Sequence, residues 1–283
     1  MPNILIADSG ATKAEWYYLF NGTGKTFFTQ GISPYFLSTE GIAEIVENEL
    51  AKKIKNQDLD AIYFYGTGCA NANNAKSVKK ALSKVFPSAK KIDVQTDLMA
   101  AARAVCGNEK GIACILGTGS NSCYYNGKKI VKNSPGLGYV LGDEGSGAYL
   151  GKKVIQYYLY NTFDEDLRSR FDAKFVTTTS EILDNVYKKP LPNRYLATYT
   201  LFLAENRGHY MIENIIEDGL NDFFFHHLCK YGEVWKYPVN FVGSVANGFK
   251  DVIKELCASY EFELGTILKN PMQGLVKYHK SQL

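Results

Sequence analysis

The stretch Gly111–Val131, "GIACILGTGSNSCYYNGKKIV", decides the fold, because an earlier part of the chain has the same pattern. In both places an apolar run enters a glycine turn, an aromatic run follows, and an Asn-Gly pair precedes another extended segment. The earlier copy starts at Ile4 with "ILIADSGATKAEWYYLFNG". The two copies are much further apart than the ~20–50 residues of a solenoid repeat, so the sequence predicts two related lobes.

Each copy predicts a strand hairpin at the start of an α/β lobe. The Asn-Gly pairs suit tight turns between strands, since both residue types tolerate positive φ. Apolar periodicity predicts the other elements. In the first half these are strands at 4–9, 15–20, 25–31, 61–65 and 92–94, and helices at 39–55, 75–86 and from Asp97. In the second half they are helices at 152–163, 195–206, 213–230 and 247–260, and a strand at 239–243. Strands mixed with helices in this order imply a mixed sheet flanked by helices in each lobe, with a cleft between the lobes.

Composition narrows the class of protein. Of the 283 residues, 46% are hydrophobic and 22% charged, as in an ordinary globular protein. The net charge is +3, and no dense Lys/Arg run is present, so nucleic-acid binding has little electrostatic support. We expect no signal peptide and no membrane span, since no apolar run reaches ~18 residues, and hence a cytoplasmic protein. The six cysteines are scattered without a C-x-x-C pair, which argues against a zinc ribbon or a redox pair.

The two glycine turns are candidate phosphate-binding sites. Glycine lets the backbone N–H groups approach phosphate oxygens, and hydroxyl or ammonium groups can add to them. Asp8, at the end of the first strand, could hold Mg²⁺ through water, because Mg²⁺ keeps several of its waters. Taken alone, either turn could be a purely structural hairpin. The candidates for binding the nucleotide phosphates are Asp8, Gly10, Thr12, Lys13, Gly117, Thr118, Gly119 and Ser120.

A third segment, "NFVGSVANGF" (240–249), places small residues between an apolar strand and a helix. Gly243, Ser244 and Ala246 would let a flat adenine ring and its ribose lie against the start of that helix. An ordinary tight strand-to-helix turn explains the same residues.

Asp97 opens the helix "DLMAAARAVCG". A carboxylate in the first turn of a helix is stabilised by the local positive potential, so a capping role is the simpler interpretation. The more specific interpretation is that Asp97 is a catalytic base, which accepts the proton of a hydroxyl that attacks the γ-phosphate.

The segment 136–151, "GLGYVLGDEGSGAYLG", places Asp143 and Glu144 between glycines. Two acids can mark a glycosidase, but adjacent side chains generally point in different directions and do not flank one bond. The segment is better explained by a single carboxylate that binds sugar hydroxyls than by a glycosidase pair.

Together these motifs resemble the sugar kinase/Hsp70/actin superfamily, and within it the N-acetylglucosamine kinases of the BadF/BadG/BcrA/BcrD-type ATPase family. "ADSGATKAEW" and "ILGTGSNS" resemble the two phosphate motifs of that family, and "FVGSVA" its adenosine motif. "LGDEGS", close behind the second phosphate motif, is the most specific match. The closing "NPMQGL" resembles a segment whose helix packs back on the first lobe.

The resemblance implies an actin-like, ribonuclease H-like fold with an N-terminal lobe at 1–108, completed by the helix 270–283, and a C-terminal lobe at 109–269. It implies ATP and Mg²⁺ as cofactors and phosphorylation of an amino sugar, N-acetylglucosamine at its 6-hydroxyl, with Asp97 as the base. The positions used around the sugar correspond to Ser33, Asn121, Gly136, Leu137 and Asp143. Ser33 stands where the family usually has Asn, and Leu137 where it often has Trp. Dimers are common in the family, which leaves a homodimer open.

Two alternatives share these motifs. One is the activating ATPase of 2-hydroxyacyl-CoA dehydratases, which needs cysteines at a subunit interface to hold an iron–sulfur cluster. The other is a non-catalytic ATP- and sugar-binding regulator. The sequence does not choose among N-acetylglucosamine, glucosamine, N-acetylmannosamine and muramic derivatives.

Overall fold

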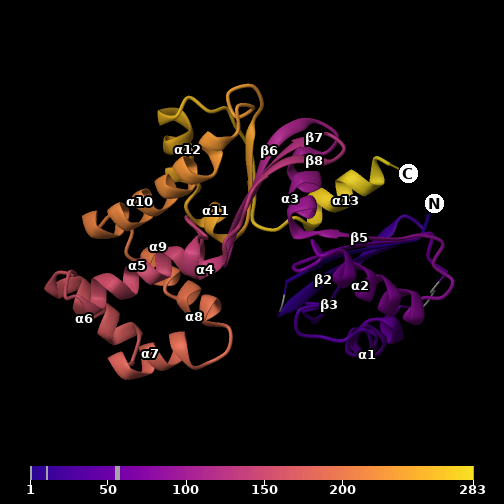
Figure 1. Cartoon of the computed structure of the whole chain (residues 1–283), viewed down its shortest axis with the longest axis horizontal. Coiled ribbons are helices and arrows are strands. Elements are labelled where there is room, and N and C mark those ends of the chain that lie inside the picture. Colours follow the sequence, from indigo (N-terminus) through magenta and orange to yellow (C-terminus); the bar gives the residue numbers. More distant parts are fainter. Residues whose placement is uncertain (1, 11, 55–57, 283) are drawn as a thin grey trace. The chain divides into compact units, whose positions relative to one another are not determined.

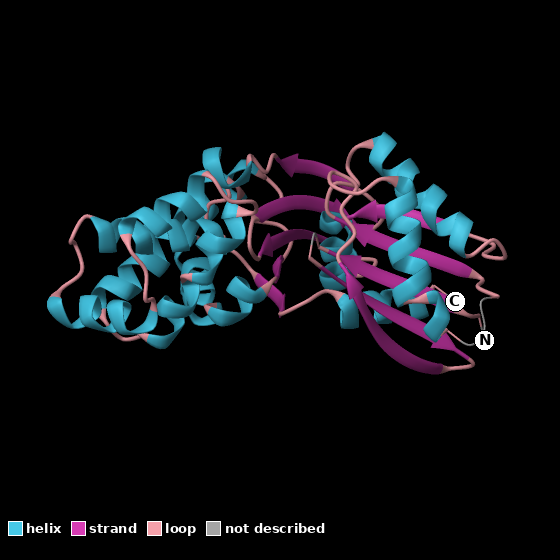
Figure 2. Ribbon diagram, turned by 90° about the horizontal axis from the view of Figure 1, so that it is seen from below, coloured by secondary structure: helices cyan, strands magenta, loops and turns pink. Residues whose placement is uncertain are grey.

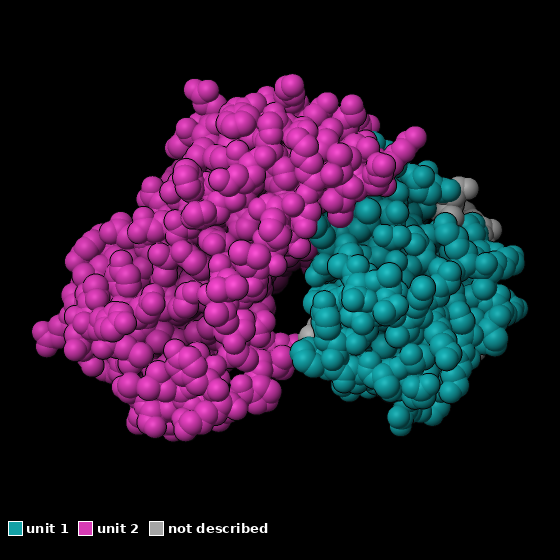
Figure 3. All heavy atoms as spheres, viewed as in Figure 1, with its two compact units in different colours: residues 1–108, 271–283 teal, residues 109–270 magenta. Residues whose placement is uncertain are grey.

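The computed structural model describes residues 2–10, 12–54 and 58–282. The chain forms two compact units, shown in different colours in Figure 3. Unit 1 comprises Met1–Asn108 and Pro271–Leu283, and unit 2 comprises Glu109–Asn270. Each unit contains a five-stranded sheet, and Figure 1 labels several of the strands.

The two sheets have the same topology, as the repeated sequence pattern predicts. The strand order is β3-β2-β1-β4-β5 in unit 1 and β8-β7-β6-β9-β10 in unit 2. On one side of the central strand (β1 or β6) lies an antiparallel hairpin, and on the other side lie two parallel strands. The strands of unit 1 are β1 Ile4–Ser9, β2 Lys13–Phe20, β3 Thr23–Gln30, β4 Ala61–Gly66 and β5 Ile92–Thr96. Those of unit 2 are β6 Lys110–Leu116, β7 Ser120–Asn126, β8 Ile130–Ser134, β9 Val239–Val242 and β10 Leu264–Leu268.

The first hairpin turns on the predicted Asn-Gly pair. Asn21 has φ 49° and Gly22 has φ 79°, the positive values that a two-residue hairpin turn with the right-handed strand twist needs. The second pair, Asn126-Gly127, forms a different kind of turn. Only Gly127 has positive φ, and the side chain of Asn126 accepts hydrogen bonds from the amides of Lys128 and Lys129 in a wider loop.

Helices cover both faces of the unit 1 sheet. One core packs the sheet against α1 and α2 and contains Trp16 and Phe64, whose ring centroids are 5.9 Å apart. The other packs it against α3 and α13, with Ile4 and Leu275 fully buried. The helices of unit 1 are α1 Thr39–Glu49, η1 Ala51–Lys53, α2 Ala72–Val85, α3 Asp97–Cys106 and α13 Met272–Lys280.

A buried polar chain ties the C-terminal helix α13 to this sheet. His279 Nε2 lies 2.8 Å from the hydroxyl of Tyr65, and Arg103 of α3 donates to the same hydroxyl at 2.7 Å. The hydroxyl accepts from Arg103 and keeps its own proton, which it can donate to Nε2 of a neutral His279 ring. Burial, and then the charge of Arg103, lower the pKa of His279 from 6.5 to about 3.

Unit 2 adds a group of helices beyond its sheet, visible in cyan in Figure 2. Its core joins β6 and β9 to α5, α10 and α12 through large side chains that include Phe223, Phe224 and Phe241. The helices are α4 Gly138–Leu141, α5 Gly147–Leu159, α6 Glu165–Lys174, α7 Thr179–Tyr187, α8 Pro192–Thr198, α9 Thr200–Glu205, α10 Tyr210–His226, η2 Leu228–Lys230, α11 Ser244–Gly248 and α12 Lys250–Ser259.

The predicted elements of unit 2 differ from the structure in several places, and the prediction has no helix at α7. Strand β10 is missing from the sequence prediction because its residues are only half-buried or exposed and show no alternation of apolar and polar positions. Helix α5 begins at Gly147, five residues earlier than expected, since Ser146 caps it through the amide of Tyr149. The segment 195–206 is two helices, α8 and α9, rather than one.

None of the six cysteines forms a disulfide, and Cys114 and Cys123 are fully buried in β6 and β7. Within the described ranges, no helix combines the length and the hydrophobicity that crossing a bilayer requires.

Candidate active site

In unit 1, several candidate residues lie at one edge of the sheet. Strands β1, β4 and β5 are parallel, so their carboxyl ends meet at that edge. Asp8 is the penultimate residue of β1, Thr67 directly follows β4, and Asp97 directly follows β5. The amide of Thr67 donates to the carbonyl of Ser9 at 3.1 Å, which fixes the end of β4 beside the end of β1.

The carboxylate of Asp97 is held by two hydrogen bonds. Thr67 Oγ1 donates to Oδ2 at 3.0 Å, and the amide of Leu98 donates to Oδ1 at 2.8 Å. The capping role considered for Asp97 belongs to Thr96, whose side chain accepts from the amide of Met99. Asp97 is therefore the first residue of α3, and its side chain is oriented by Thr67, which directly follows the neighbouring strand β4, and by the amide of Leu98.

Negative charge accumulates around Asp8. Burial, and then the carboxylates of Asp97 and Glu15, raise the pKa of Asp8 from 3.8 to about 7. A cation would relieve this repulsion. No group of three or more His, Cys, Asp or Glu side chains arranged to hold a metal occurs in the part of the chain that the structure describes. The buried carboxylate of Asp8, with Asp97 and Glu15 near it, suits an ion that takes one or two ligands from the protein, as Mg²⁺ commonly does when it accompanies a nucleotide.

The first glycine turn joins β1 to β2. The amide of Gly10 donates to the carbonyl of Lys13 at 3.1 Å and closes it, while Ala11 lies outside the described residues. Thr12 and Lys13 are exposed, and the Lys13 ammonium lies 3.7 Å from the centroid of the Phe28 ring on β3. The turn thus presents a hydroxyl and a positive charge at the same edge as Asp8.

Ser33 is brought to this edge by Ser9. The hydroxyl of Ser9 accepts from the amide of Ile32 at 2.9 Å and lies 3.2 Å from its carbonyl. Ser33 itself is 2% exposed, and its hydroxyl has no hydrogen-bond partner among the residues that the structure describes. A buried hydroxyl without a partner costs free energy, so this position is suited to a ligand that supplies one.

In unit 2, the second glycine turn is bonded to the start of α5. The amide of Gly117 donates to the carbonyl of Gly119 at 3.0 Å and closes the turn. The amides of Gly147 and Ala148, in the first turn of α5, donate to the carbonyls of Gly117 and Thr118 at 2.8 and 3.0 Å. The turn is therefore held rigidly by backbone contacts.

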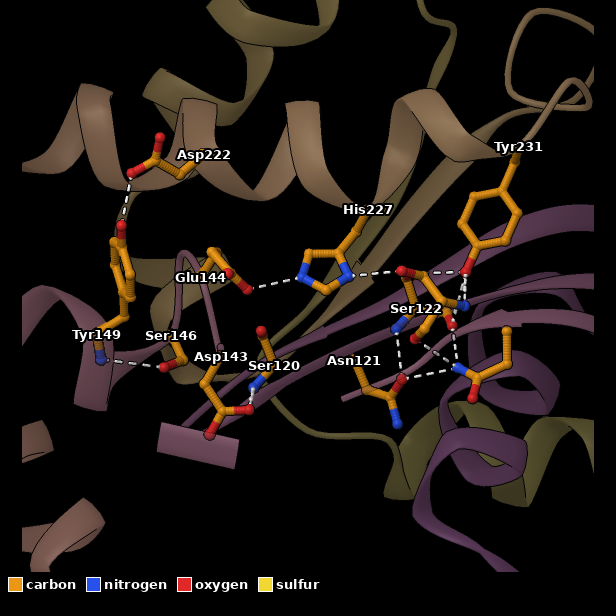
Figure 4. A network of polar contacts seen from close by, with 12 residues as sticks. Ser120, Asn121, Ser122, Asp143, Glu144, Ser146, Tyr149, Asp222, His227 and Tyr231 are labelled. Atoms are coloured by element: carbon orange, nitrogen blue, oxygen red, sulfur yellow. Dashed lines mark hydrogen bonds and ion pairs between the residues drawn. The ribbon is translucent and has the colours of Figure 1, made fainter. Parts of the chain in front are cut away.

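Asp143 lies directly beside this turn (Figure 4). Its Oδ1 is 3.5 Å from the amide of Ser120, and a Cβ on Gly119 would be 3.0 Å from its Oδ2. Burial raises the pKa of Asp143, and the Ser120 amide partly offsets that. The hydroxyl of Ser120 is buried and finds no partner in the described ranges, so the turn holds an unsatisfied donor next to a carboxylate.

The other two sugar candidates that approach each other in unit 2 are Asn121 and Gly136. The side-chain oxygen of Asn121 accepts from the amide of Ser122 at 2.9 Å and from Nδ2 of Asn133 at 2.8 Å. A Cβ on Gly136 would lie 3.3 Å from the carbonyl of Ser120 and 3.8 Å from Asn121 Nδ2. Leu137 does not join them, since it is 57% exposed.

The expected adenosine segment packs on the same glycine turn. Gly243 has φ 137°, and a Cβ there would be 2.0 Å from the carbonyl of Leu116. Only glycine permits this approach of β9 to the end of β6. Ser244 opens α11, and Ala246 is buried within it. The nucleotide candidates of unit 2 are thus contiguous.

Sequence reasoning missed two residues of these sites. Thr67 carried a signal, because a polar residue that directly follows a parallel strand lies at the carboxyl edge of the sheet. His227 has no such signal in the sequence, because it is adjacent to His226 and the pair does not have the spacing of metal-binding histidines.

No family model matches the chain. A solved structure from Porphyromonas gingivalis, of a protein assigned as an N-acetylglucosamine kinase, is 37% identical and superimposes with a TM-score of 0.93, covering 98% of this chain and 99% of that one. The N-acetylmuramic acid/N-acetylglucosamine kinase of Clostridium acetobutylicum is 24% identical over 192 residues, and the match spans 65% of this chain and 62% of that kinase.

A solved structure with much lower sequence identity shares the fold. MreB 5 of Spiroplasma citri, solved with AMPPNP, superimposes with a TM-score of 0.57 at 10% identity over 100% of this chain and 97% of its own. This likeness concerns the fold alone, which is that of actin-like ATPases. Together with the 37% identity to the Porphyromonas protein over nearly the full length of both chains, it shows that the chain belongs to the N-acetylglucosamine kinase family of actin-like fold.

Proposed function

We propose that the protein transfers the γ-phosphoryl group of ATP to the 6-hydroxyl of an amino sugar, N-acetylglucosamine first among them. The observation that carries the proposal is the environment of Asp97: a carboxylate oriented by Thr67 and Leu98 at the same sheet edge as Asp8. The names of the two kinase relatives support the choice of an amino sugar.

Asp97 would act as the base. Its carboxylate accepts two hydrogen bonds, which fix its orientation and leave lone pairs for the proton of a sugar hydroxyl. In kinases an aspartate commonly removes the proton of the hydroxyl that attacks the phosphoryl group.

Asp8 would hold Mg²⁺, through water, with the nucleotide phosphates. When bound, that ion neutralises charge that develops on the phosphates. The chain's own contribution is the acidic site of Asp8, Glu15 and Asp97, whose mutual repulsion favours a cation.

The glycine turns would bind the phosphate oxygens. Gly10, Thr12 and Lys13 do so in unit 1, and Gly117, Thr118, Gly119 and Ser120 in unit 2. Backbone N–H groups and hydroxyls in such turns stabilise the charge of phosphate oxygens. Gly243, Ser244 and Ala246 would accommodate the adenosine.

The sugar would contact Asn121, Gly136 and Asp143 in unit 2 and Ser33 in unit 1. The carboxylate of Asp143 and the unpartnered hydroxyl of Ser33 can both bond to sugar hydroxyls. Leu137, which is exposed, would give an apolar contact where an aromatic ring is common in the family.

Two observations bear on the alternatives. Cys114 and Cys123 are fully buried, which does not suit ligands of a cluster shared between subunits. A non-catalytic regulator has no need of a base, yet Asp97 is oriented by two hydrogen bonds.

The test is ADP release in a coupled assay with N-acetylglucosamine, glucosamine, N-acetylmannosamine and N-acetylmuramic acid, with the phosphorylated carbon identified by NMR. We expect sugar-dependent ADP release and a 6-phosphate product. ATP binding without sugar-dependent ADP release for any of the four sugars would instead indicate the regulator.

A further inference from the structure

The segment between β8 and α5 carries three of the proposed sugar contacts, Gly136, Leu137 and Asp143. From residue 135 to residue 141 it is mostly exposed, and its only helix, α4, has four residues. A connection of this kind keeps its side chains in place only if its ends are fixed.

One imidazole contacts both ends of this segment (Figure 4). His227 Nδ1 lies 2.9 Å from Oγ of Ser134, the last residue of β8, and His227 Nε2 lies 2.9 Å from Oε2 of Glu144. His227 is 5% exposed and is the C-cap of α10, where its amide donates to the carbonyl of Phe223 at 3.0 Å. The imidazole is therefore fixed to a long helix of the core.

The chemistry of Glu144 sets the direction of its hydrogen bond with His227. A carboxylate can only accept, so Nε2 carries a proton and donates it. The hydroxyl of Ser134 can pair with Nδ1 as donor or as acceptor. Burial raises the pKa of Glu144, but the hydrogen bond from His227, a backbone hydrogen bond and the two nearby histidines together leave that pKa below its ordinary value.

Neighbouring contacts fix the same two ends. Gly145 has φ 69°, and a Cβ there would be 2.8 Å from Cβ of Phe223, so the turn after Glu144 lies directly on α10. At the other end, the amide of Ser134 donates to the hydroxyl of Tyr231 at 2.6 Å, and that hydroxyl lies 3.0 Å from the carbonyl of Ser122. His227 is the residue that contacts both ends through its side chain.

We propose that His227 is a positioning residue for sugar binding: it holds Ser134 and Glu144 and thereby fixes the intervening segment, so that Asp143 stays beside Ser120 and Gly136 beside Asn121. The inference rests on the proposed function for the identity of the ligand. It also divides the adjacent acids between two roles, with Glu144 bound to the protein and Asp143 available to the sugar.

The first test is hydrogen–deuterium exchange of the free protein, without ATP or sugar. In His227→Ala, amides of residues 136–143 should exchange at least threefold faster than in the wild type, while those of strand β4 in unit 1 should be unchanged. His226→Gln is the matched control, because His226 is the adjacent histidine and is exposed. Should His227→Ala fail to fold, Ser134→Ala removes one of the two bonds and is measured in its place.

The second test compares the KM for the sugar with the KM for ATP in each variant. Loss of the imidazole should raise the KM for the sugar about tenfold or more and change the KM for ATP less than twofold. His227→Gln retains a donor near the position of Nε2, so its sugar KM should lie between those of the wild type and His227→Ala. A role limited to stability would lower the amount of active enzyme without this split between substrates.

Equal exchange of the amides of residues 136–143 in His227→Ala and His226→Gln would overturn the inference, as would equal changes of both KM values. The outcome remains distinct from that of the proposed function. If the wild type phosphorylates no sugar, the proposed function fails, and hydrogen exchange still decides whether His227 holds the segment.

Discussion

Thr67 Oγ1 donates a hydrogen bond to Asp97 Oδ2 at 3.0 Å, linking the residues that directly follow two neighbouring parallel strands. Thr67→Val removes the hydroxyl but keeps the shape of the side chain. A hydrogen bond to a charged group contributes about 1.5–3 kcal/mol, so kcat should fall roughly 10- to 100-fold while the KM for ATP changes little. Steady-state kinetics measure both quantities. Thr67→Ser keeps the hydroxyl and should retain most of the activity, and an equal loss in both variants would contradict the role of this bond.

The close contact of Gly119 with Asp143 predicts a defect in sugar binding. In Gly119→Ala the new Cβ would be 3.0 Å from Oδ2 of Asp143, so the carboxylate must shift by a few tenths of an ångström. We expect the KM for the sugar to rise about tenfold, since small displacements of positioning groups have large kinetic effects. Gly232→Ala is the control, because a Cβ there meets no described atom within 4 Å. A sugar KM equal to that of the control would argue against Asp143 as a ligand.

Gly243 should be indispensable for the stability of unit 2. Alanine there would have φ 137° and a Cβ 2.0 Å from the carbonyl of Leu116. The backbone conformation alone costs about 1–3 kcal/mol, and relief of the overlap must add to that. Chemical denaturation of Gly243→Ala should show a loss of this size or larger. Gly248→Ala, five residues further on and without any described atom within 4 Å of its Cβ, should leave the free energy of unfolding nearly unchanged. Similar unfolding midpoints for both variants would refute the steric argument.

The buried His279 predicts a pH dependence of stability. Its pKa is about 3 in the folded protein against 6.5 ordinarily, so folding favours the neutral ring. The stability that this residue contributes is present above pH 6.5 and is lost as the pH falls toward 3. Between pH 7.5 and pH 5 the loss should be about 2 kcal/mol.

Comparison with His279→Gln isolates this contribution, since other groups titrate alike in both proteins. The difference in unfolding free energy between wild type and variant should shrink by about 2 kcal/mol as the pH falls from 7.5 to 5. A difference that stays constant over this range would show that His279 does not titrate in this way. His226→Gln, at an exposed position, is the control variant.

The sequence predicts the parts of the site that follow from repetition. The Asn-Gly pairs and glycine turns recur at matching places, and both sheets indeed have the same strand order. Asp97 is a candidate for another reason: it opens a helix ahead of the second glycine turn, and the family resemblance places the base there.

What the sequence does not show are contacts made by packing between distant segments. Asp143 lies beside Gly119 because the amides of Gly147 and Ala148 bond to the glycine turn. Glu144 meets His227 because α10 lies against the turn at Gly145. These relations depend on how helices pack on the sheet, and no local pattern of residues encodes them.

The most direct test of the proposed kinase chemistry is the turnover of Asp97→Asn, measured as formation of sugar phosphate from ATP and N-acetylglucosamine, together with its ATP affinity. Asparagine keeps the size and one acceptor oxygen of the side chain but cannot take up the proton. We predict that kcat falls about 10²–10⁴-fold, the usual contribution of a general base, while the Kd for ATP stays within about threefold of the wild type. A variant that phosphorylates the sugar at the wild-type rate would contradict the assignment of Asp97 as the base.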